Sequence, residues 1–272
     1  MRGETAGVRR RTARACPPGA AALALAFAFA LPAAAGAAAR AVSSPGATAA
    51  ACASAPIAGD STVLLGLAAG QRVALVHVPP GIPAGRRVPL VLALHGYRGS
   101  GLQMERYSGF SSVADRHGFV VVYPSSSGLY WNSTGSPALP DDVAFLSQLI
   151  TYLEQHMCVD SRRVFATGVS NGGGMVALLG CELSSQIAAI APVAGGYSGQ
   201  PPCLPARPVS VLEIHGTADQ VVPYFGPRRR PTADGVPPFV NGWARRDQCS
   251  PVAGSVQILS LIHISEPTRQ AE

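Results

Sequence analysis

The chain contains no lysine, because all 21 of its basic residues are arginine. Charged residues make up only 13% of the 272 residues, whereas hydrophobic residues make up 47%. A chain this apolar and weakly charged is not intrinsically disordered, and its 30 Gly and 24 Pro follow no collagen-like period. The sequence therefore indicates a globular protein, and its length suits one large domain.

The net charge of +6 is concentrated near the N-terminus. The first forty residues contain six arginines and a single acid, Glu4. Between residues 41 and 258 there are 14 arginines and 12 acidic residues, so this part of the chain is nearly neutral. The basic character therefore gives no support to a nucleic-acid partner, and we expect none.

Residues 1–40 have the pattern of a secretory signal peptide. A basic segment from Arg2 to Arg14 precedes an apolar segment from Gly19 to Leu31, and small residues suited to cleavage follow. The apolar segment is shorter than the roughly 20 residues of a stable membrane span, so we expect export without a membrane anchor. A lipid anchor at Cys52 fits less well, because this cysteine lies far past the apolar segment. A linker rich in Ala, Ser, Pro and Gly at residues 41–60 would connect the leader to the folded domain.

The last fourteen residues, LSLIHISEPTRQAE, differ from the Ala-, Gly- and Arg-rich body. From Leu259 onward they resemble the translation of a transposase adapter used to prepare sequencing libraries. We therefore expect residues 259–272 to be foreign to the fold, and the domain at residues 61–258 to be incomplete at its C-terminal end. The alternative is a genuine C-terminal strand.

The six cysteines do not have the spacing of a metal site, since no CxxC or Cys/His ligand pattern occurs. We therefore expect no metal, and in an exported chain the cysteines indicate disulfides. Cys16 would be removed with the leader. One of the remaining five would then be unpaired or have its partner beyond the present chain, and the sequence does not decide the pairs. These five are Cys52, Cys158, Cys181, Cys203 and Cys249.

From Ser61 onward, short apolar segments rich in β-branched residues alternate with helical segments. This alternation predicts a mostly parallel α/β sheet with helices on both faces. The expected strands are 62–67, 72–78, 88–94, 119–123, 163–167, 187–193, 209–214 and 255–258. The expected helices are 102–117, one that starts at 141–142, 171–183 and 239–246.

The segment Gly168-Val169-Ser170-Asn171-Gly172 is a GxSxG motif between a predicted strand and a predicted helix. This strand–turn–helix setting is typical of a nucleophile elbow, in which a strained turn exposes the serine hydroxyl. Ser170 is therefore the candidate nucleophile, at the carboxyl end of the sheet where open α/β sheets bind ligands. The alternative is a glycine-rich helix start with a capping serine.

A serine nucleophile requires an oxyanion hole, and two backbone N–H groups are candidates. One is the amide of Asn171, the first helical residue after the elbow. The other is the amide of Tyr97, in the segment LHGYRGSG that follows a buried strand. In the same segment, His95 is interpreted as a structural hydrogen-bonding residue rather than as a catalytic base.

Asp219 is the candidate acid, because it follows the strand 209–214 at the same sheet edge. Such an aspartate orients an imidazole and stabilises its protonated form. There are four rival carboxylates. Asp141 and Asp142 have the position of helix-start residues, and Asp160 precedes its strand and so lies at the opposite edge of the sheet. The fourth is Asp247.

The catalytic base is missing from the expected position. In this arrangement the chain order is serine, acid, histidine. The only histidine after Asp219 is His263, inside the adapter-like segment, and His215 at a strand end is interpreted as structural. We therefore expect the catalytic histidine to be absent from this chain.

These motifs together resemble the family of polyhydroxybutyrate depolymerases and feruloyl esterases, which are secreted α/β-hydrolases. The residues that carry the resemblance are GVSNGGGM, CVDSRRVFATG, LHGYRGSG, the DDVAFL helix start, IHGTADQVVPYFG and WARRDQC. The resemblance implies an α/β-hydrolase fold and hydrolysis of carboxylic esters, with Ser170 as nucleophile and Asp219 as acid. It also implies a secreted enzyme without cofactor, which we expect to act as a monomer on a small-molecule or polymeric ester.

The substrate is less well defined by the sequence. Trp131 and Tyr224 lie in predicted loops and are candidates for contacting a phenolic acyl group. The alternative is that they anchor their loops on the core. Two other functions stay open: an acyltransferase that uses the same residues, and a non-catalytic binding protein on a hydrolase fold.

Overall fold

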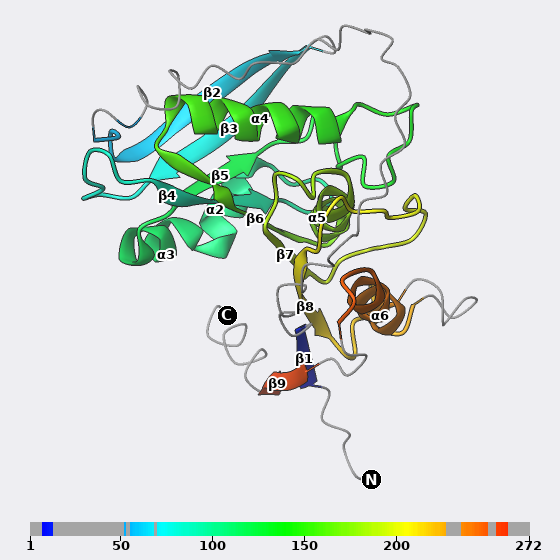
Figure 1. Cartoon of the computed structure of the whole chain (residues 1–272). Helices are drawn as coiled ribbons and strands as arrows, with labels where there is room; N and C mark the ends of the chain where they lie inside the picture. Colours follow the sequence, from blue (N-terminus) through cyan, green and yellow to red (C-terminus); the bar gives the residue numbers. More distant parts are fainter. Residues whose placement is uncertain are drawn as a thin grey trace, which may run out of the picture.

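The computed structural model describes residues 7–12, 52, 55–67, 70–226, 235–249 and 254–260. The strands in these ranges form one sheet in the order β2-β3-β5-β4-β6-β7-β8-β1-β9 (Figure 1). They are β1 (Gly7–Thr12), β2 (Gly59–Leu67), β3 (Gly70–Val78), β4 (Val88–Leu94), β5 (Val120–Pro124), β6 (Val159–Val169), β7 (Ala189–Val193), β8 (Ser210–Gly216) and β9 (Gly254–Ser260). The helices are α2 (Gly101–Ser108), α3 (Phe110–His117), α4 (Asp142–His156), α5 (Asn171–Glu182) and α6 (Val236–Arg246).

The centre of the sheet is parallel. Strands β5, β4, β6, β7 and β8 are parallel neighbours, whereas β2 and β3 are antiparallel at one side and β1 and β9 at the other. Parallel strands end at the same edge, so the segments after β4, β6 and β8 come together there. This is the arrangement that the sequence predicts for Tyr97, Ser170 and Asp219.

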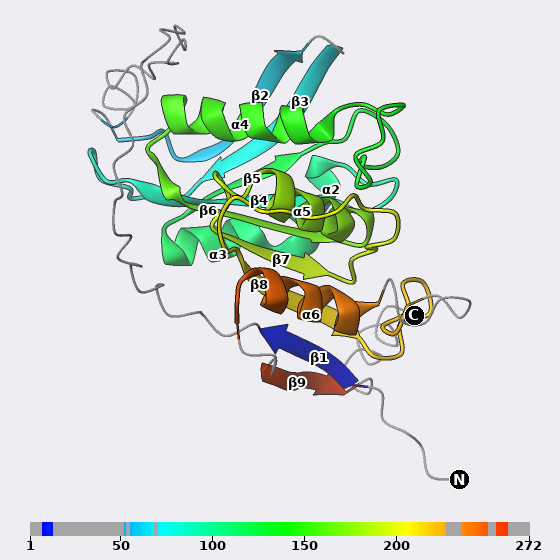
Figure 2. The same cartoon turned by 45° about the vertical axis from the view of Figure 1, so that its right-hand side comes forward.

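Helices cover both faces of the sheet, as predicted from the alternation of strands and helices (Figure 2). Alternate residues of a strand point to opposite faces. Leu90 and Leu92 of β4 therefore belong to the large core with α4, α5 and α6, whereas Ala93 belongs to a smaller core with α2 and α3. Over β6, β7 and β8, this second face presents apolar side chains to a cavity that Phe110 of α3 also lines.

The helix predicted at residues 102–117 is two helices in the structure. Gly109 lies between α2 and α3 with a φ of 64°, a left-handed conformation that ends the first helix. The predicted strand 88–94 is correct to the residue, and the other predicted elements are found with shifted ends.

The sequence analysis predicts no strand near the N-terminus, yet β1 lies within residues 1–40 and pairs with β8 and β9. Strand β9 extends to Ser260, two residues into the segment predicted to be foreign. The leader at residues 1–40 and the foreign segment at residues 259–272 stay predictions. Residues 13–40, most of the linker at residues 41–60, and residues 261–272 with His263 lie outside the described residues.

Two disulfides join described cysteines, Cys52 to Cys158 and Cys181 to Cys203. Cys249 is also disulfide-bonded, and no described cysteine is free. Four of these five cysteines thus pair among themselves, and the expectation that removal of the leader leaves one of the five without a partner stays a prediction. The presence of disulfides agrees with the sequence analysis.

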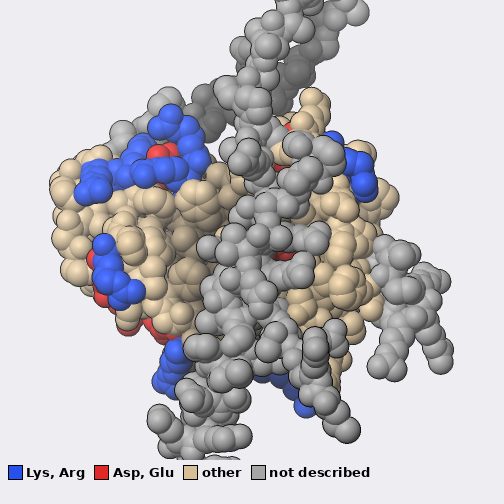
Figure 3. All heavy atoms as spheres, turned by 90° about the horizontal axis from the view of Figure 1, so that it is seen from below, with Lys and Arg blue, Asp and Glu red and all other residues tan. Residues whose placement is uncertain are grey.

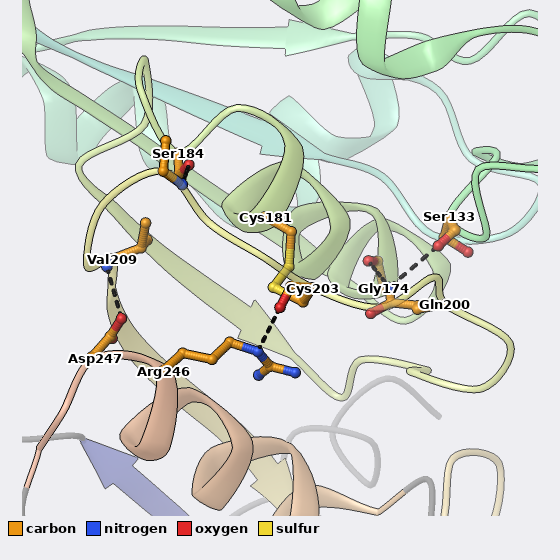
Figure 4. The surroundings of a disulfide bond; sticks show 10 residues. Ser133, Gly174, Cys181, Ser184, Gln200, Cys203, Val209, Arg246 and Asp247 are labelled. Atoms are coloured by element: carbon orange, nitrogen blue, oxygen red, sulfur yellow. Dashed lines mark hydrogen bonds between the residues drawn. A yellow bond between two sulfur atoms is a disulfide. The ribbon is translucent and has the colours of Figure 1, made fainter.

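The Cys181–Cys203 bond ties the segment before β8 to α5 (Figure 4). In the same region, the Arg246 guanidinium of α6 donates to the Cys203 carbonyl at 3.1 Å. The Gln200 side-chain amide donates to the carbonyl of Gly174 at 2.6 Å. These contacts hold the segment that leads from β7 to β8 against α5 and α6.

Charge is dispersed on the face drawn in Figure 3. The arginine side chains there lie in separate groups, some of them beside acidic side chains, with uncharged surface between them. In the described part of the chain, no helix is long and apolar enough to cross a bilayer.

Candidate active site

Ser170 lies in a strained turn between β6 and α5. Its φ of 57° and ψ of −119° fall outside the regions that non-glycine residues usually adopt. The turn is held by two hydrogen bonds, from the Ser170 amide to the Val193 carbonyl at 2.9 Å and from the Gly174 amide to the Ser170 carbonyl at 3.0 Å. Strain at a half-buried serine on the carboxyl edge of the sheet is the geometry of a nucleophile elbow.

The two glycines of the motif are required by close packing. A Cβ atom on Gly168 would lie 2.6 Å from the carbonyl oxygen of Gly172. A Cβ atom on Gly172 would lie 2.3 Å from the carbonyl oxygen of His95 and 2.6 Å from that of Leu94. A side chain at Gly168 or Gly172 would therefore prevent β6, α5 and the end of β4 from meeting at this point.

The segment after β4 lies directly against the elbow. A Cβ atom on Gly96 would lie 3.5 Å from the Cβ atom of Ser170, and Tyr97 is the next residue. Gly96 begins a turn that the Gly99 amide closes by donating to the Gly96 carbonyl at 3.1 Å. Tyr97 and Asn171, whose backbone amides were nominated from the sequence, are thus the residues that follow Gly96 and Ser170 at this contact. None of the described groups accepts a hydrogen bond from either amide outside regular helix and strand pairing.

His95 has a structural role. Its Nδ1 lies 2.8 Å from the Gly96 carbonyl, and its Nε2 accepts a hydrogen bond from the Ser126 amide at 3.0 Å. The carbonyl can only accept, so Nδ1 carries the proton of a neutral ring. Burial lowers the pKa of His95 and outweighs the opposing hydrogen bond to Gly96. Both nitrogens are engaged, so neither is available to Ser170.

Asp219 follows β8 in a turn that fixes its carboxylate. One oxygen, Oδ1, accepts hydrogen bonds from the amides of Val221 and Val222, each at 2.8 Å. The other oxygen, Oδ2, lies 3.6 Å from Nε2 of His215. One strand, β7, separates the strands that precede Ser170 and Asp219, so these two strands are about 10 Å apart by ordinary strand spacing.

The four rival carboxylates have structural partners. Asp141 caps α4 by accepting from the Ala144 amide at 2.9 Å. Asp160 pairs with arginines of its own strand, and Asp247 accepts from the Val209 amide at 3.3 Å. The fourth, Asp142, is buried, and it is not merely a helix-start residue, as described next.

Asp142 forms a buried ion pair that sequence reasoning missed. Its Oδ1 lies 2.6 Å from the guanidinium of Arg72 on β3, and its Oδ2 accepts from the Asn132 amide at 2.7 Å. The Arg72 guanidinium also lies over the ring of Phe145, 4.0 Å from its centre. The sequence does not indicate that these two residues form an ion pair, because the arginine in a strand and the acid at a helix start are far apart in the chain.

The side chain of Asn171 anchors a loop, a role that the sequence did not indicate. Its Oδ1 accepts from the Trp131 amide at 2.7 Å, and its Nδ2 donates to the Trp131 carbonyl at 3.1 Å. The Arg98 amide donates to the Leu129 carbonyl at 2.6 Å. The loop around residues 129–131 is thereby fixed beside the nucleophile and the candidate oxyanion amides.

The two aromatic residues nominated for substrate binding are both buried. Trp131 is 1% exposed, and its indole N–H donates to the His95 carbonyl at 2.9 Å. Tyr224 is 3% exposed and packs edge-on to His215. This burial favours the alternative interpretation, in which they anchor loops on the core. The exposed aromatic residues near Ser170 are instead Tyr97 and Tyr130, whose ring centres are 6.2 Å apart.

No group of three or more metal-binding side chains occurs in the part of the chain that the structure describes. The chemistry that this site supports directly is nucleophilic attack by a hydroxyl with backbone stabilisation of an oxyanion.

Comparison with known proteins agrees with this geometry. Residues 71–203 match the family model described as esterase PHB depolymerase. The chain is 36% identical over 169 residues to the putative esterase NocK of Nocardia uniformis subsp. tsuyamanensis, covering 59% of this chain and 48% of that protein. It is 34% identical over 163 residues to feruloyl esterase B of Piromyces equi, covering 57% of this chain and 30% of that protein. The chain thus spans less than half the length of these two relatives.

Among solved structures, a thermostable esterase superposes with a TM-score of 0.50 at 20% identity, covering 69% of this chain and 52% of the other. At this identity the likeness concerns the fold, which is that of the α/β-hydrolases. The match to the esterase PHB depolymerase model thus covers the region that contains the serine elbow, in a chain with an α/β-hydrolase fold.

Proposed function

We propose that this protein is a carboxylic-ester hydrolase that acts through an acyl-enzyme on Ser170. The observation that carries the proposal is the strained conformation of Ser170, at an elbow flanked by the amides of Tyr97 and Asn171. Its relatives are named as esterases, which supports the same reaction class.

In the proposed reaction, Ser170 Oγ attacks the ester carbonyl carbon while an imidazole takes its proton. The amides of Tyr97 and Asn171 stabilise the negative charge on the carbonyl oxygen, at an estimated benefit of about 3 kcal/mol per donor. The C–O bond then breaks, the alcohol leaves with the proton, and the acyl group stays on Ser170. Water, activated by the same imidazole, releases the acid and restores the serine.

The imidazole in this scheme comes from outside the described residues. Both nitrogens of His95 are engaged, as are both nitrogens of His215, which contact Glu213 and Val222. Among the described residues, no hydrogen bond links any histidine to the hydroxyl of Ser170. Asp219 Oδ2, which accepts no described backbone hydrogen bond, is the oxygen that would orient the base.

A free base in solution tests this assignment. If the chain lacks its own base, added imidazole should raise the rate of p-nitrophenyl acetate hydrolysis, and His263→Ala should leave the rate unchanged. A His263→Ala variant that loses activity would show that His263 is the base. The prediction that residues 259–272 are foreign would then be wrong.

The acyl group that we propose is aromatic. Tyr97 and Tyr130 are 57% and 44% exposed, and the two loops that carry them are joined by the bond between Arg98 and Leu129. Planar phenolic groups pack well against such rings. The name of one relative, feruloyl esterase B, agrees with a phenolic acyl group.

The substrate proposal is tested by comparing methyl ferulate with methyl acetate. Tyr97→Ala and Tyr130→Ala should lower kcat/KM for the ferulate by about tenfold and change it little for the acetate. An equal loss on both esters would contradict an aromatic subsite. Transfer of the acyl group to an added alcohol in preference to water would identify an acyltransferase instead.

We further propose that the protein is exported and acts as a monomer. The basic and apolar segments of residues 1–40 and the disulfides support export, because disulfides persist in oxidising compartments. N-terminal sequencing of the protein recovered from culture medium tests this proposal. A protein that retains Arg9 and stays inside the cell would contradict it.

Activity assays with Ser170→Ala test the central step. Removal of the nucleophile of a complete triad costs on the order of 10⁴-fold or more in rate, so in this chain Ser170→Ala should abolish the turnover that added imidazole restores. Ser161→Ala, at an exposed position of β6, is the matched control and should keep full activity. Near-normal turnover by Ser170→Ala would refute the proposed mechanism.

A further inference from the structure

His215 lies one residue before the end of β8, buried beneath the turn that carries Asp219. It is 2% exposed, and its two ring nitrogens have separate partners. Nδ1 lies 2.9 Å from Oε1 of Glu213, and Nε2 lies 2.7 Å from the carbonyl oxygen of Val222. The described titratable groups around the ring are Glu213, Asp219 and the hydroxyl-bearing rings of Tyr197 and Tyr224. On the neighbouring strand β1, Arg9 and Arg11 are opposite His215 and Glu213 in the strand register.

The partners of the ring determine where its protons are. A carbonyl oxygen only accepts hydrogen bonds, so Nε2 must carry a proton. Nδ1 faces Glu213, which is fully buried and also accepts a hydrogen bond from the Tyr197 hydroxyl. Burial raises the pKa of Glu213, and its hydrogen bonds with His215 and Tyr197 oppose this rise. An imidazolium at hydrogen-bond distance supplies a cation for its carboxylate. Burial opposes protonation, but Glu213, Val222 and Asp219 together raise the pKa of His215.

The same residue, Val222, connects His215 with Asp219. The Val222 amide donates to Oδ1 of Asp219 at 2.8 Å, while its carbonyl accepts from His215. His215 Nε2 also lies 3.6 Å from Oδ2 of Asp219. The ring therefore holds both the backbone of the turn and, by its charge, the carboxylate at the turn's start.

We propose that His215 is a positioning residue, which as an imidazolium paired with Glu213 fixes the Asp219–Val222 turn and so orients Asp219 toward the catalytic base. This inference rests on the proposed function, in which Asp219 acts on the base. His215 itself touches neither the substrate nor Ser170.

Two measurements on the full chain need no activity. In ¹⁵N-detected NMR, both nitrogens of His215 should be mostly protonated at pH 6.5, and Glu213→Gln should shift its titration to lower pH. In hydrogen exchange, the amides of Val221 and Val222 should lose protection in His215→Gln. His156→Gln, at an exposed histidine of α4, is the matched control and should leave both amides protected. A singly protonated His215, or unchanged protection in His215→Gln, would overturn the proposal.

Kinetics distinguish positioning from a purely structural role. In imidazole buffer, which supplies the base, His215→Gln should lower kcat by about 10²-fold with little change in KM, as expected for a misplaced catalytic group. The double variant Glu213→Gln/His215→Gln removes the uncompensated buried charge, so it should recover the thermal stability lost in His215→Gln but not kcat. Recovery of kcat in the double variant would overturn the proposal.

The Ser170→Ala variant tests the proposed function independently of the proposed role of His215. If Ser170→Ala keeps its activity, the mechanism is wrong whatever His215 does. If Ser170→Ala is inactive while His215→Gln behaves like His156→Gln, the mechanism stands and the role of His215 does not.

Discussion

Replacing Arg72 by methionine removes one partner of the buried ion pair with Asp142. The two side chains are 6% and 2% exposed, and their nearest charged atoms are 2.6 Å apart. Asp142 has one other described hydrogen bond, from the Asn132 amide, so in the variant its charge would be buried with a single partner. The contact of the guanidinium with the ring of Phe145 is lost as well.

Breaking a buried pair in this way costs about 3–5 kcal/mol of unfolding free energy, because the remaining charge is desolvated without compensation. The free energy of unfolding of Arg72→Met should therefore be about 3–5 kcal/mol below that of the unmodified protein. The double variant Arg72→Met/Asp142→Leu has no charge left at this pair. Beyond the Arg72 contacts that the single variant also loses, it loses the hydrogen bond to Asn132, at about 1–3 kcal/mol. The double variant should thus be more stable than the single one.

Urea unfolding followed by tryptophan fluorescence measures these differences, since Trp131 and Trp243 are both buried. Arg162→Met is the matched control, because the Arg162 side chain is 89% exposed in its pair with Asp160 and should matter by less than about 1 kcal/mol. A loss below about 1 kcal/mol in Arg72→Met, or a double variant less stable than the single one, would refute the reasoning.

Two further predictions concern the elbow and a surface histidine. Gly172→Ala should destabilise the protein by about 1–3 kcal/mol or more, since the new Cβ would overlap the His95 carbonyl; Gly196→Ala, in open space, is the control. Thermal unfolding should show a clear fall in Tm only for the first, and equal Tm values would contradict the packing argument. His77 contacts two aspartates, which raise its pKa although partial burial opposes this. Its protonated form therefore stabilises the fold below the unfolded pKa, and this stability is lost as the pH rises through the folded pKa. His77→Gln should cost more stability at pH 5.5 than at pH 8.5, and the reverse order would show that the sign is wrong.

The elbow could be predicted because its signal is local. Gly168, Ser170 and Gly172 lie within five residues, between a strand and a helix that each show their own pattern. Asp219 could be nominated because it follows a strand whose carboxyl end meets the same edge. The structure places both residues at the edge that the parallel strand order requires.

Contacts between distant segments could not be predicted. The pair of Arg72 with Asp142 and the anchoring of Trp131 by Asn171 depend on how the sheet brings together residues that are far apart in the chain. Trp131 was nominated for substrate because an aromatic residue in a loop has the same sequence pattern whether it is exposed or buried. Strand β1 was missed because GVRRRT has no alternation of apolar and polar residues, so its place depends on pairing with β8 and β9.

The most direct test of the account is to identify the residue that a fluorophosphonate modifies. The full chain is treated in imidazole buffer, which supplies a base in solution, and peptides are mapped by mass spectrometry. The account predicts one phosphonyl group on Ser170, present in Ser161→Ala and absent from Ser170→Ala. Modification of another residue, or of none, in the folded protein would contradict the assignment of Ser170 as the nucleophile.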